Sequence, residues 1–145
     1  MKVKIKSKVD MRKLPEKLQR EISRVLMAAG YIIEFDAKQF CPVNTGRLRA
    51  SIHTEQIAFN KVEVGTNVFY APYVEYGTLP HFPPVEPLKR WAHLHGMPEE
   101  AAWAIAQKIA KYGTEPQPFM RPAFMKNKKL VKKLIKNKIK EILKG

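Results

Sequence analysis

The chain has 145 residues, which is enough for one compact domain with a usable core but leaves little room for a second. Aliphatic and aromatic residues make up 45% of it, and charged residues interrupt every long apolar run, which excludes a membrane-spanning segment. The formal net charge of +14 favours an anionic partner, such as nucleic acid, a membrane surface or an acidic protein face.

Most of this charge lies near the C-terminus. Between residues 121 and 145 there are ten Lys or Arg residues against one acid, Glu141, so this segment carries +9 of the total. We therefore expect a single α+β domain over residues 1–124, followed by a basic amphipathic helix over residues 125–145.

The N-terminal segment and the single cysteine indicate a cytoplasmic protein. Residues 1–6 alternate charged and apolar side chains and lack the apolar core of a signal peptide, so we expect synthesis and residence in a cytoplasm. Cys41, the one cysteine, can form neither an internal disulfide nor a cysteine-rich metal site.

The predicted elements begin with a strand over residues 2–9, where lysines alternate with apolar residues. A long amphipathic helix follows, from a cap at Asp10 to Cys41. Between residues 45 and 68, alternation around a turn at residues 60–61 predicts a hairpin or meander packed on this helix. The strand assignment includes Leu48, Ala50 and Ile52.

The second half of the chain is expected to be mainly helical. Short helices are predicted over residues 70–77, 85–95 and 98–112, with a proline-rich loop before the second of them. A proline-rich connection then leads into the C-terminal helix, whose apolar stripe consists of Leu130, Val131, Leu134, Ile135, Ile139, Ile142 and Leu143. The predicted fold class is α+β: a long N-terminal helix packed on a small antiparallel sheet, with short helices and a basic C-terminal helix.

Few residues favour catalysis or metal binding. Cys41 could pair with a histidine as thiolate and base, but a cysteine that closes an apolar helix is more often a buried small hydrophobe. His93 and His95, with Glu99 or Glu100, could ligate a metal, yet residues two apart on a helix point to different sides. We therefore predict no catalytic, cofactor-binding or metal-binding residues and no enzymatic activity.

Three segments resemble a known family. Residues 42–52 (PVNTGRLRASI) are similar to P-x-(D/N)-T-G-x-L-(R/K)-x-S-I, which follows the first helix of phage tail-completion and head-tail joining proteins. Residues 64–78 (VGTNVFYAPYVEYGT) resemble that family's V-G-(T/S)-x-x-x-Y-A-x-Y-(V/L)-E-x-G-T, and residues 113–123 (GTEPQPFMRPA) resemble its G-T-x-P-x-P-F-(L/M)-x-P-A. The three matches occur in the family order and together span more than half of the chain.

The resemblance implies a non-enzymatic virion protein that completes or joins the head-tail (neck) region of a phage or provirus particle. It implies self-association in a ring and contacts with connector or adaptor proteins and tail tube proteins. It also implies location in the virion, and in the host cytoplasm during assembly. The motif residues expected to shape or contact an interface are Asn44, Thr45, Gly46, Arg47, Arg49, Tyr70, Tyr73, Glu75, Tyr76, Gly77, Pro118 and Phe119.

The motif residues also have plain physical roles. Residues 44–46 suit a tight turn, because Asn and Gly tolerate left-handed backbone. Tyr70, Tyr73 and Tyr76 recur every three residues, a spacing that would stack three rings along one side of a helical turn. Ordinary packing explains these rings as well as an interface does.

The alternative function is a non-specific nucleic-acid-binding module that acts through the C-terminal helix. Lysines there could neutralise phosphates, although no aromatic residue lies among them to stack on bases. A solvated helix face, an acidic protein partner and an anionic lipid surface are the other interpretations, and the stripe lacks the Trp and Phe typical of lipid interfaces, so we expect no membrane partner. The proposed contact residues are Lys128, Lys129, Lys132, Lys133, Lys136 and Lys140.

Overall fold

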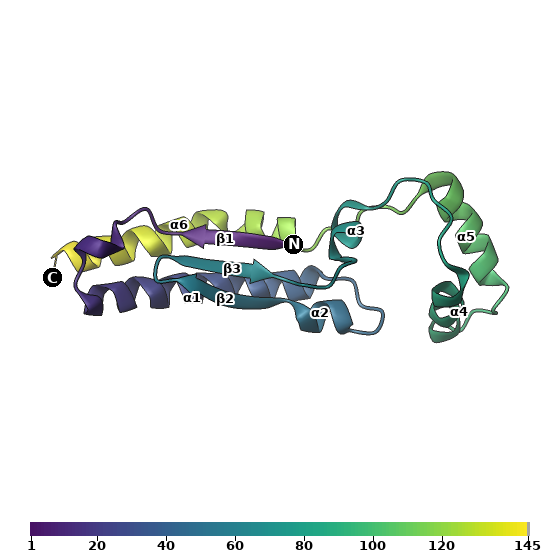
Figure 1. Cartoon of the computed structure of the whole chain (residues 1–145), viewed down its shortest axis with the longest axis horizontal. Helices are drawn as coiled ribbons and strands as arrows, with labels where there is room; N and C mark the ends of the chain where they lie inside the picture. The colour runs from purple at the N-terminus through teal and green to yellow at the C-terminus, as the bar shows by residue number, and fades with distance from the viewer. Residues whose placement is uncertain (145) are drawn as a thin grey trace. The chain divides into compact units, whose positions relative to one another are not determined.

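The computed structural model describes residues 1–144 and contains two compact units. The sheet unit comprises residues 1–71 and the segment that begins at Pro118, and the hairpin unit comprises residues 72–117. The architecture is α+β, as the sequence predicted, with helices and one antiparallel sheet (Figure 1). Within the described residues, no helix combines the length and the apolar character needed to cross a membrane.

The sheet has three antiparallel strands in the order β1-β3-β2. β1 spans Lys2–Lys6, β2 spans His53–Ala58 and β3 spans Lys61–Gly65. Ile5 lies opposite Val62 in the register, and both side chains are buried, while the lysines of β1 point to solvent. Period-two alternation thus sets which face is core, as predicted, although β1 ends at Lys6 rather than at residue 9.

The long N-terminal helix, α1, spans Glu16–Phe40 and begins later than predicted. Asp10 caps a short 3-10 turn over Met11–Lys13 instead, where its carboxylate accepts a hydrogen bond from the Arg12 amide at 3.1 Å. Pro15 explains the later start, because a residue that precedes proline avoids helical backbone, and Leu14 is extended with φ −101° and ψ 143°.

One side of α1 packs closely on β2 and β3 (Figure 1). Gly30 makes this approach possible, because a Cβ there would lie 2.5 Å from the Thr54 Cγ2 and 3.0 Å from the Val62 Cγ1. The Thr54 hydroxyl donates to the Glu34 carboxylate at 2.7 Å. The sheet is therefore held to α1 by apolar contact and by hydrogen bonds.

Another side of α1 packs against α6, which spans Met120–Lys144. The carboxylate of Asp36, only 8% exposed, accepts hydrogen bonds from the Asn127 amide at 2.6 Å and from the Lys126 ammonium at 3.2 Å. Farther along, Lys138 forms an ion pair with Glu21 at 2.8 Å. These pairs fix the register of the two helices.

The apolar stripe predicted for the C-terminal helix was right only in part. Val131 is buried, but Leu130 is 45% exposed and Leu143 is 75% exposed. α6 packs on α1 through a narrow strip of its surface. Side chains beside that strip are therefore exposed to solvent. The helix also starts at Met120, so the domain boundary predicted at residue 124 falls inside it.

Residues 47–51 form a short helix, α2 (Arg47–Ser51), and the strand predicted there was wrong. Gly46, with φ +83°, precedes the helix, and the Ala50 amide donates to the Gly46 carbonyl at 2.9 Å. Leu48 and Ile52 are buried while Ala50 is exposed. Their four-residue spacing fits one face of a helix as well as it fits alternation, and five residues are too few to separate the two.

The hairpin unit is helical, as predicted. α3 (Ala71–Tyr76) leads into it, and α4 (Val85–Leu94) and α5 (Ala101–Tyr112) pack against each other and are joined by a short loop. The fully buried side chains on α4 and α5 are alanines, namely Ala92, Ala102 and Ala106. These small residues let the two helices approach closely, but they supply little apolar surface to the core.

The Asp36 contacts predict acid sensitivity. The Asn127 amide, and then Lys126, lower the pKa of the Asp36 carboxyl despite its burial. A lowered pKa stabilises the fold above the unfolded-state value of about 3.9, and this stabilisation disappears as the pH falls through the lower folded value. We expect Asp36→Asn to lower the free energy of unfolding by about 1–2 kcal/mol at pH 7, and the deficit to vanish in acid.

Urea unfolding at several pH values measures this difference. Glu141→Gln is the matched control, because Glu141 is exposed and its one ion pair within residues 1–144, with Lys138, is a long 3.5 Å. An equal and pH-independent loss in both variants would show that Asp36 does not fix the α1–α6 register.

Candidate interaction site

The loop before α2 presents three of the predicted residues to solvent. Asn44, Thr45 and Arg47 are exposed, and the Arg47 amide donates to the Thr45 hydroxyl at 3.4 Å. Gly46 adopts a positive φ in open space, with no atom within 4 Å of where a Cβ would be. The conformation, and not a close neighbour, therefore makes glycine favourable there.

Arg49 lies on the same short helix but has an internal partner. Its guanidinium donates to the carbonyl oxygen of Cys41 at 3.3 Å, which connects α2 to the end of α1. Cys41 is buried, as the sequence predicted, and burial raises the pKa of its thiol. A neutral, enclosed thiol suits packing and does not suit nucleophilic attack.

Beside Arg47 lies a shallow depression with a volume of about 380 Å³. Its lining joins α2 to β2 and to the segment after β3, and consists of Arg47, Ser51, His53, Asn67, Val68 and Phe69. Of these six residues, only Arg47 was predicted as an interface residue from the sequence. The others could have been found from position, because most of them lie inside the first two motif matches.

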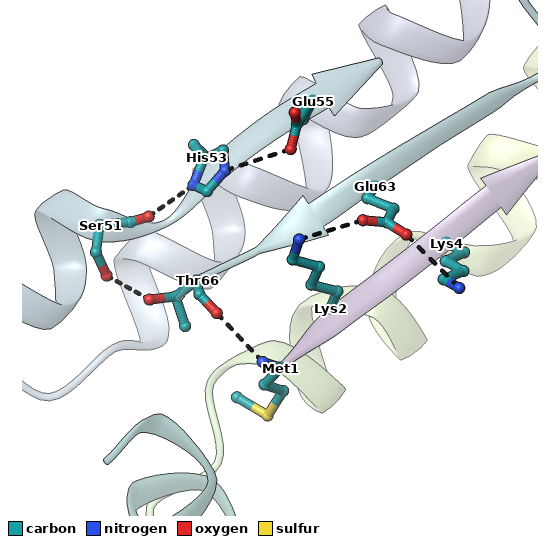
Figure 2. A network of polar contacts seen from close by, with 8 residues as sticks. All are labelled: Met1, Lys2, Lys4, Ser51, His53, Glu55, Glu63 and Thr66. Carbon is teal, nitrogen blue, oxygen red and sulfur yellow. Dashed lines mark hydrogen bonds and ion pairs between the residues drawn. The ribbon is translucent and has the colours of Figure 1, made fainter. Parts of the chain in front are cut away.

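A network of hydrogen bonds includes Ser51 and His53, two of the residues that line this depression (Figure 2). The hydroxyls of Ser51 and Thr66 lie 2.6 Å apart, and the carbonyl of Thr66 accepts from the N-terminal ammonium of Met1 at 3.2 Å. His53 Nδ1 lies 2.9 Å from the Ser51 carbonyl. His53 therefore contacts the backbone of Ser51, and the Ser51 hydroxyl is engaged by Thr66 and by the Leu48 carbonyl.

The outer face of the sheet continues from this network. Glu63 on β3 forms ion pairs with Lys2 and Lys4 (Figure 2), at distances of 3.5 Å and 3.6 Å. Two lysines thus share one carboxylate across the β1–β3 pair. The face next to the depression remains polar and cationic.

The three regularly spaced tyrosines do not stack on one another. Tyr73 and Tyr76 are 58% and 64% exposed, whereas Tyr70 packs edge-on against Phe69 with ring centroids 5.4 Å apart. The three-residue spacing places their Cβ atoms near one side, but the long side chains extend into solvent. Tyr73 and Tyr76 are therefore available to a partner.

Two other predicted interface residues are inside the protein. Glu75 is 2% exposed and Phe119 is fully buried. In this conformation neither side chain can contact a partner protein. Pro118, directly before Phe119, is exposed. Sequence alone could not separate these cases, because a motif residue that fixes the fold and one that contacts a partner are equally characteristic of a family.

Two glycines bring the ends of the second and third motif matches together. Thr78 and Thr114 form an antiparallel bridge with both amide-carbonyl distances at 3.1 Å and the hydroxyls 2.9 Å apart. Gly77 and Gly113 flank this bridge with φ +73° and +74°. A Cβ on Gly113 would lie 2.0 Å from the Thr78 carbonyl oxygen. The end of the motif match at residues 64–78 and the start of the match at residues 113–123 thus lie side by side.

The six lysines proposed on the C-terminal helix lie on one exposed face of α6. All are exposed, and their positions fall on the side of the helix opposite Asn127 and Val131, which are buried. Across residues 1–144, none of the six takes part in an ion pair. The lysine face consists of Lys128, Lys129, Lys132, Lys133, Lys136 and Lys140.

The two histidines considered as metal ligands do not share a site: one stacks on a tryptophan and the other faces solvent. His95 stacks on Trp91 with ring centroids 4.1 Å apart, and its Nδ1 lies 2.8 Å from the Trp91 carbonyl. His93 is exposed on α4, and Glu99 pairs with Lys89 at 2.8 Å. In the part of the chain that the structure describes, no three His, Cys, Asp or Glu side chains converge as a metal site would require.

The flanking glycines give a prediction. Gly113→Ala should lower the free energy of unfolding by about 3 kcal/mol or more, because its φ of +74° with ψ −160° is open only to glycine and the added Cβ would overlap Thr78. Gly46→Ala is the matched control and should cost only about 1 kcal/mol, since its surroundings are open. Urea unfolding would measure both, and equal losses would contradict the role of the threonine bridge.

Comparison with known proteins identifies the N-terminal half of the chain. Residues 6–77 match the model of the HK97-gp10-like family, described as "Bacteriophage HK97-gp10, putative tail-component". The matched segment contains α1, the sheet hairpin and the loop before α2, whereas α4, α5 and α6 lie beyond it. No curated protein and no solved structure matches the chain. Over residues 6–77 this chain therefore belongs to the HK97-gp10-like family of bacteriophage tail components.

Proposed function

We propose that this protein is a non-enzymatic structural component of a phage or provirus particle that joins or completes the neck between head and tail. The family match over residues 6–77 carries this proposal, because it supports a structural role in a phage tail. The three motif matches to tail-completion and head-tail joining proteins favour the neck position. The protein then belongs to the virion, and is present in the host cytoplasm during assembly.

The contacts are proposed from the exposed residues of the motif matches. Arg47 and the adjoining loop present a cation and polar groups beside a depression whose lining residue Ser51 is hydrogen-bonded to Thr66. Tyr73 and Tyr76 present aromatic rings with polar ends, a residue type enriched at interfaces. Their partners are connector or adaptor proteins, tail tube proteins and neighbouring copies in a ring. The buried motif residues, Glu75 and Phe119, preserve the fold that displays these groups.

Particle assembly tests this proposal. Disruption of the coding sequence should yield filled heads and separate tails in negative-stain images of the lysate. Normally joined particles in that lysate would contradict a neck function.

A charge reversal locates the contact. We expect Arg47→Glu to reduce the fraction of joined particles at least tenfold while leaving unfolding unchanged, because Arg47 is exposed and takes part in no ion pair within residues 1–144. Lys13→Glu is the control with the same charge change, on an exposed residue of the 3-10 turn. Equal joining in both variants would remove Arg47 from the interface.

A second function, non-specific DNA contact, is favoured by the lysine face of α6. Six exposed lysines without ion-pair partners in the described chain concentrate positive charge where a phosphate backbone could lie. Lysine provides charge without base readout, so this contact would be independent of sequence and sensitive to salt. Such contact is compatible with a neck protein, because DNA passes through the neck.

Fluorescence anisotropy with a short DNA duplex across a salt series tests this function. Replacing Lys128, Lys132 and Lys136 by Gln should lower the slope of log affinity against log salt by about one per lysine removed. The control replaces Lys6, Lys8 and Lys13, which are also exposed and remove the same charge. Identical slopes in the two triple variants would show that binding reports net charge only.

A further inference from the structure

The solvent side of α5 has a regular pattern of charge. Glu100 lies at its start and Lys111 near its end, with Trp103, Ala104 and Gln107 between them. Steps of three or four residues place these five side chains along one side of the helix. All five are exposed, and Trp103 is 52% exposed. We call these five residues the α5 outer face.

The two charged ends of this face have no ionic partner within residues 1–144. Among the residues described, neither Glu100 nor Lys111 forms an ion pair, although the neighbouring Glu99 is paired with Lys89. The ammonium of Lys111 lies 5.0 Å from the ring centroid of Tyr112, which leaves it open to a carboxylate. The face therefore has an acidic end, an apolar centre at Trp103 and a basic end.

The centre of the face is apolar surface that the hairpin unit leaves uncovered. The fully buried side chains of α4 and α5 are alanines, while the much larger indole of Trp103 is half in solvent. An indole that is half exposed can supply the apolar part of a contact, because aromatic side chains with a polar group are enriched at interfaces. Ala104 beside it is small enough to let another helix approach closely.

We propose that the α5 outer face binds the same face of a second copy of this chain, with the two helices antiparallel about a two-fold axis. Glu100 and Lys111 are eleven residues apart, which is about 16 Å along a helix. An axis midway between Ala104 and Gln107 places Glu100 of each copy opposite Lys111 of the other. Ala104 of each copy then lies opposite Gln107 of the other, and Trp103 lies beside that Gln107.

The net charges of the two units favour the hairpin unit of a second copy as the partner of the α5 outer face. The hairpin unit has four Lys or Arg residues and five Glu residues, a net charge of −1, whereas the rest of the chain has a net charge of +15. Sheet units of two copies repel each other, but hairpin units do not. In a two-fold contact the same face of both copies meets. A face with an acidic end and a basic end fits this arrangement, because each acidic end then lies opposite a basic end.

This contact goes beyond the proposed function and does not depend on it. A two-fold contact closes at two copies, so it is separate from the contacts that would make a ring. One helix of 12 residues buries less than the roughly 800 Å² per partner of a standard interface, and we expect a weak, reversible dimer that salt weakens further.

Sedimentation equilibrium of the full chain over a range of concentrations tests the proposal. The wild type should show a monomer-dimer equilibrium. Glu100→Lys and Lys111→Glu should each weaken the dimer by about tenfold, because each places like charges opposite one another. Arg90→Glu is the control, since Arg90 is exposed on α4 in the same unit and undergoes the same charge change as Lys111→Glu.

Mixing the two single variants separates pairing from misfolding. One variant then has two cations on its face and the other has two carboxylates, so an equimolar mixture should form a mixed dimer about as tight as the wild-type dimer. Recovery of the dimer on mixing would establish the antiparallel pairing. A wild type that stays monomeric, single variants that dimerise like the control, or a mixture without recovery would each overturn it.

Discussion

The fold depends on α1, a helix buried on two sides at once. One side meets the sheet at Gly30, where the absence of a side chain lets β2 and β3 come within contact distance. The other side meets α6 through Asp36, Asn127 and the Glu21–Lys138 ion pair. Because α1 fills the space between these two partners, it positions both the depression beside Arg47 and the lysine face of α6.

The distribution of charge divides the chain into a strongly basic sheet unit and a nearly neutral hairpin unit. Asp36 and Glu21 neutralise the lysines of α6 that face α1, so the remaining lysines point away from the protein core. The hairpin unit, with a net charge of −1, provides the surface on which copies can meet without repulsion. A strongly basic chain can therefore approach an anionic partner through one region and another copy of itself through a different one.

Much of the fold could be predicted from the sequence, because a long regular pattern of apolar residues identifies an element as a strand or a helix. The alternation in β1 and the helical spacing in α1 predicted a strand with one apolar side and a long amphipathic helix, and both are present. Short segments were harder to assign: residues 47–51 fit a strand and a helix equally well until Gly46 is known to have positive φ. Glu75 and Phe119 were predicted at an interface because their motifs could be recognised, but burial depends on long-range packing that no local pattern encodes.

The central claim is that this protein is part of the neck of a phage or provirus particle. Cryo-electron microscopy of purified particles, with mass spectrometry of the same preparation, tests it most directly. A neck protein should be present in stoichiometric amounts, with density at the head-tail junction that fits α1, α6 and the three-stranded sheet. Absence of the chain from joined, DNA-filled particles would contradict a role in the virion, and density at the distal end of the tail would contradict the neck assignment.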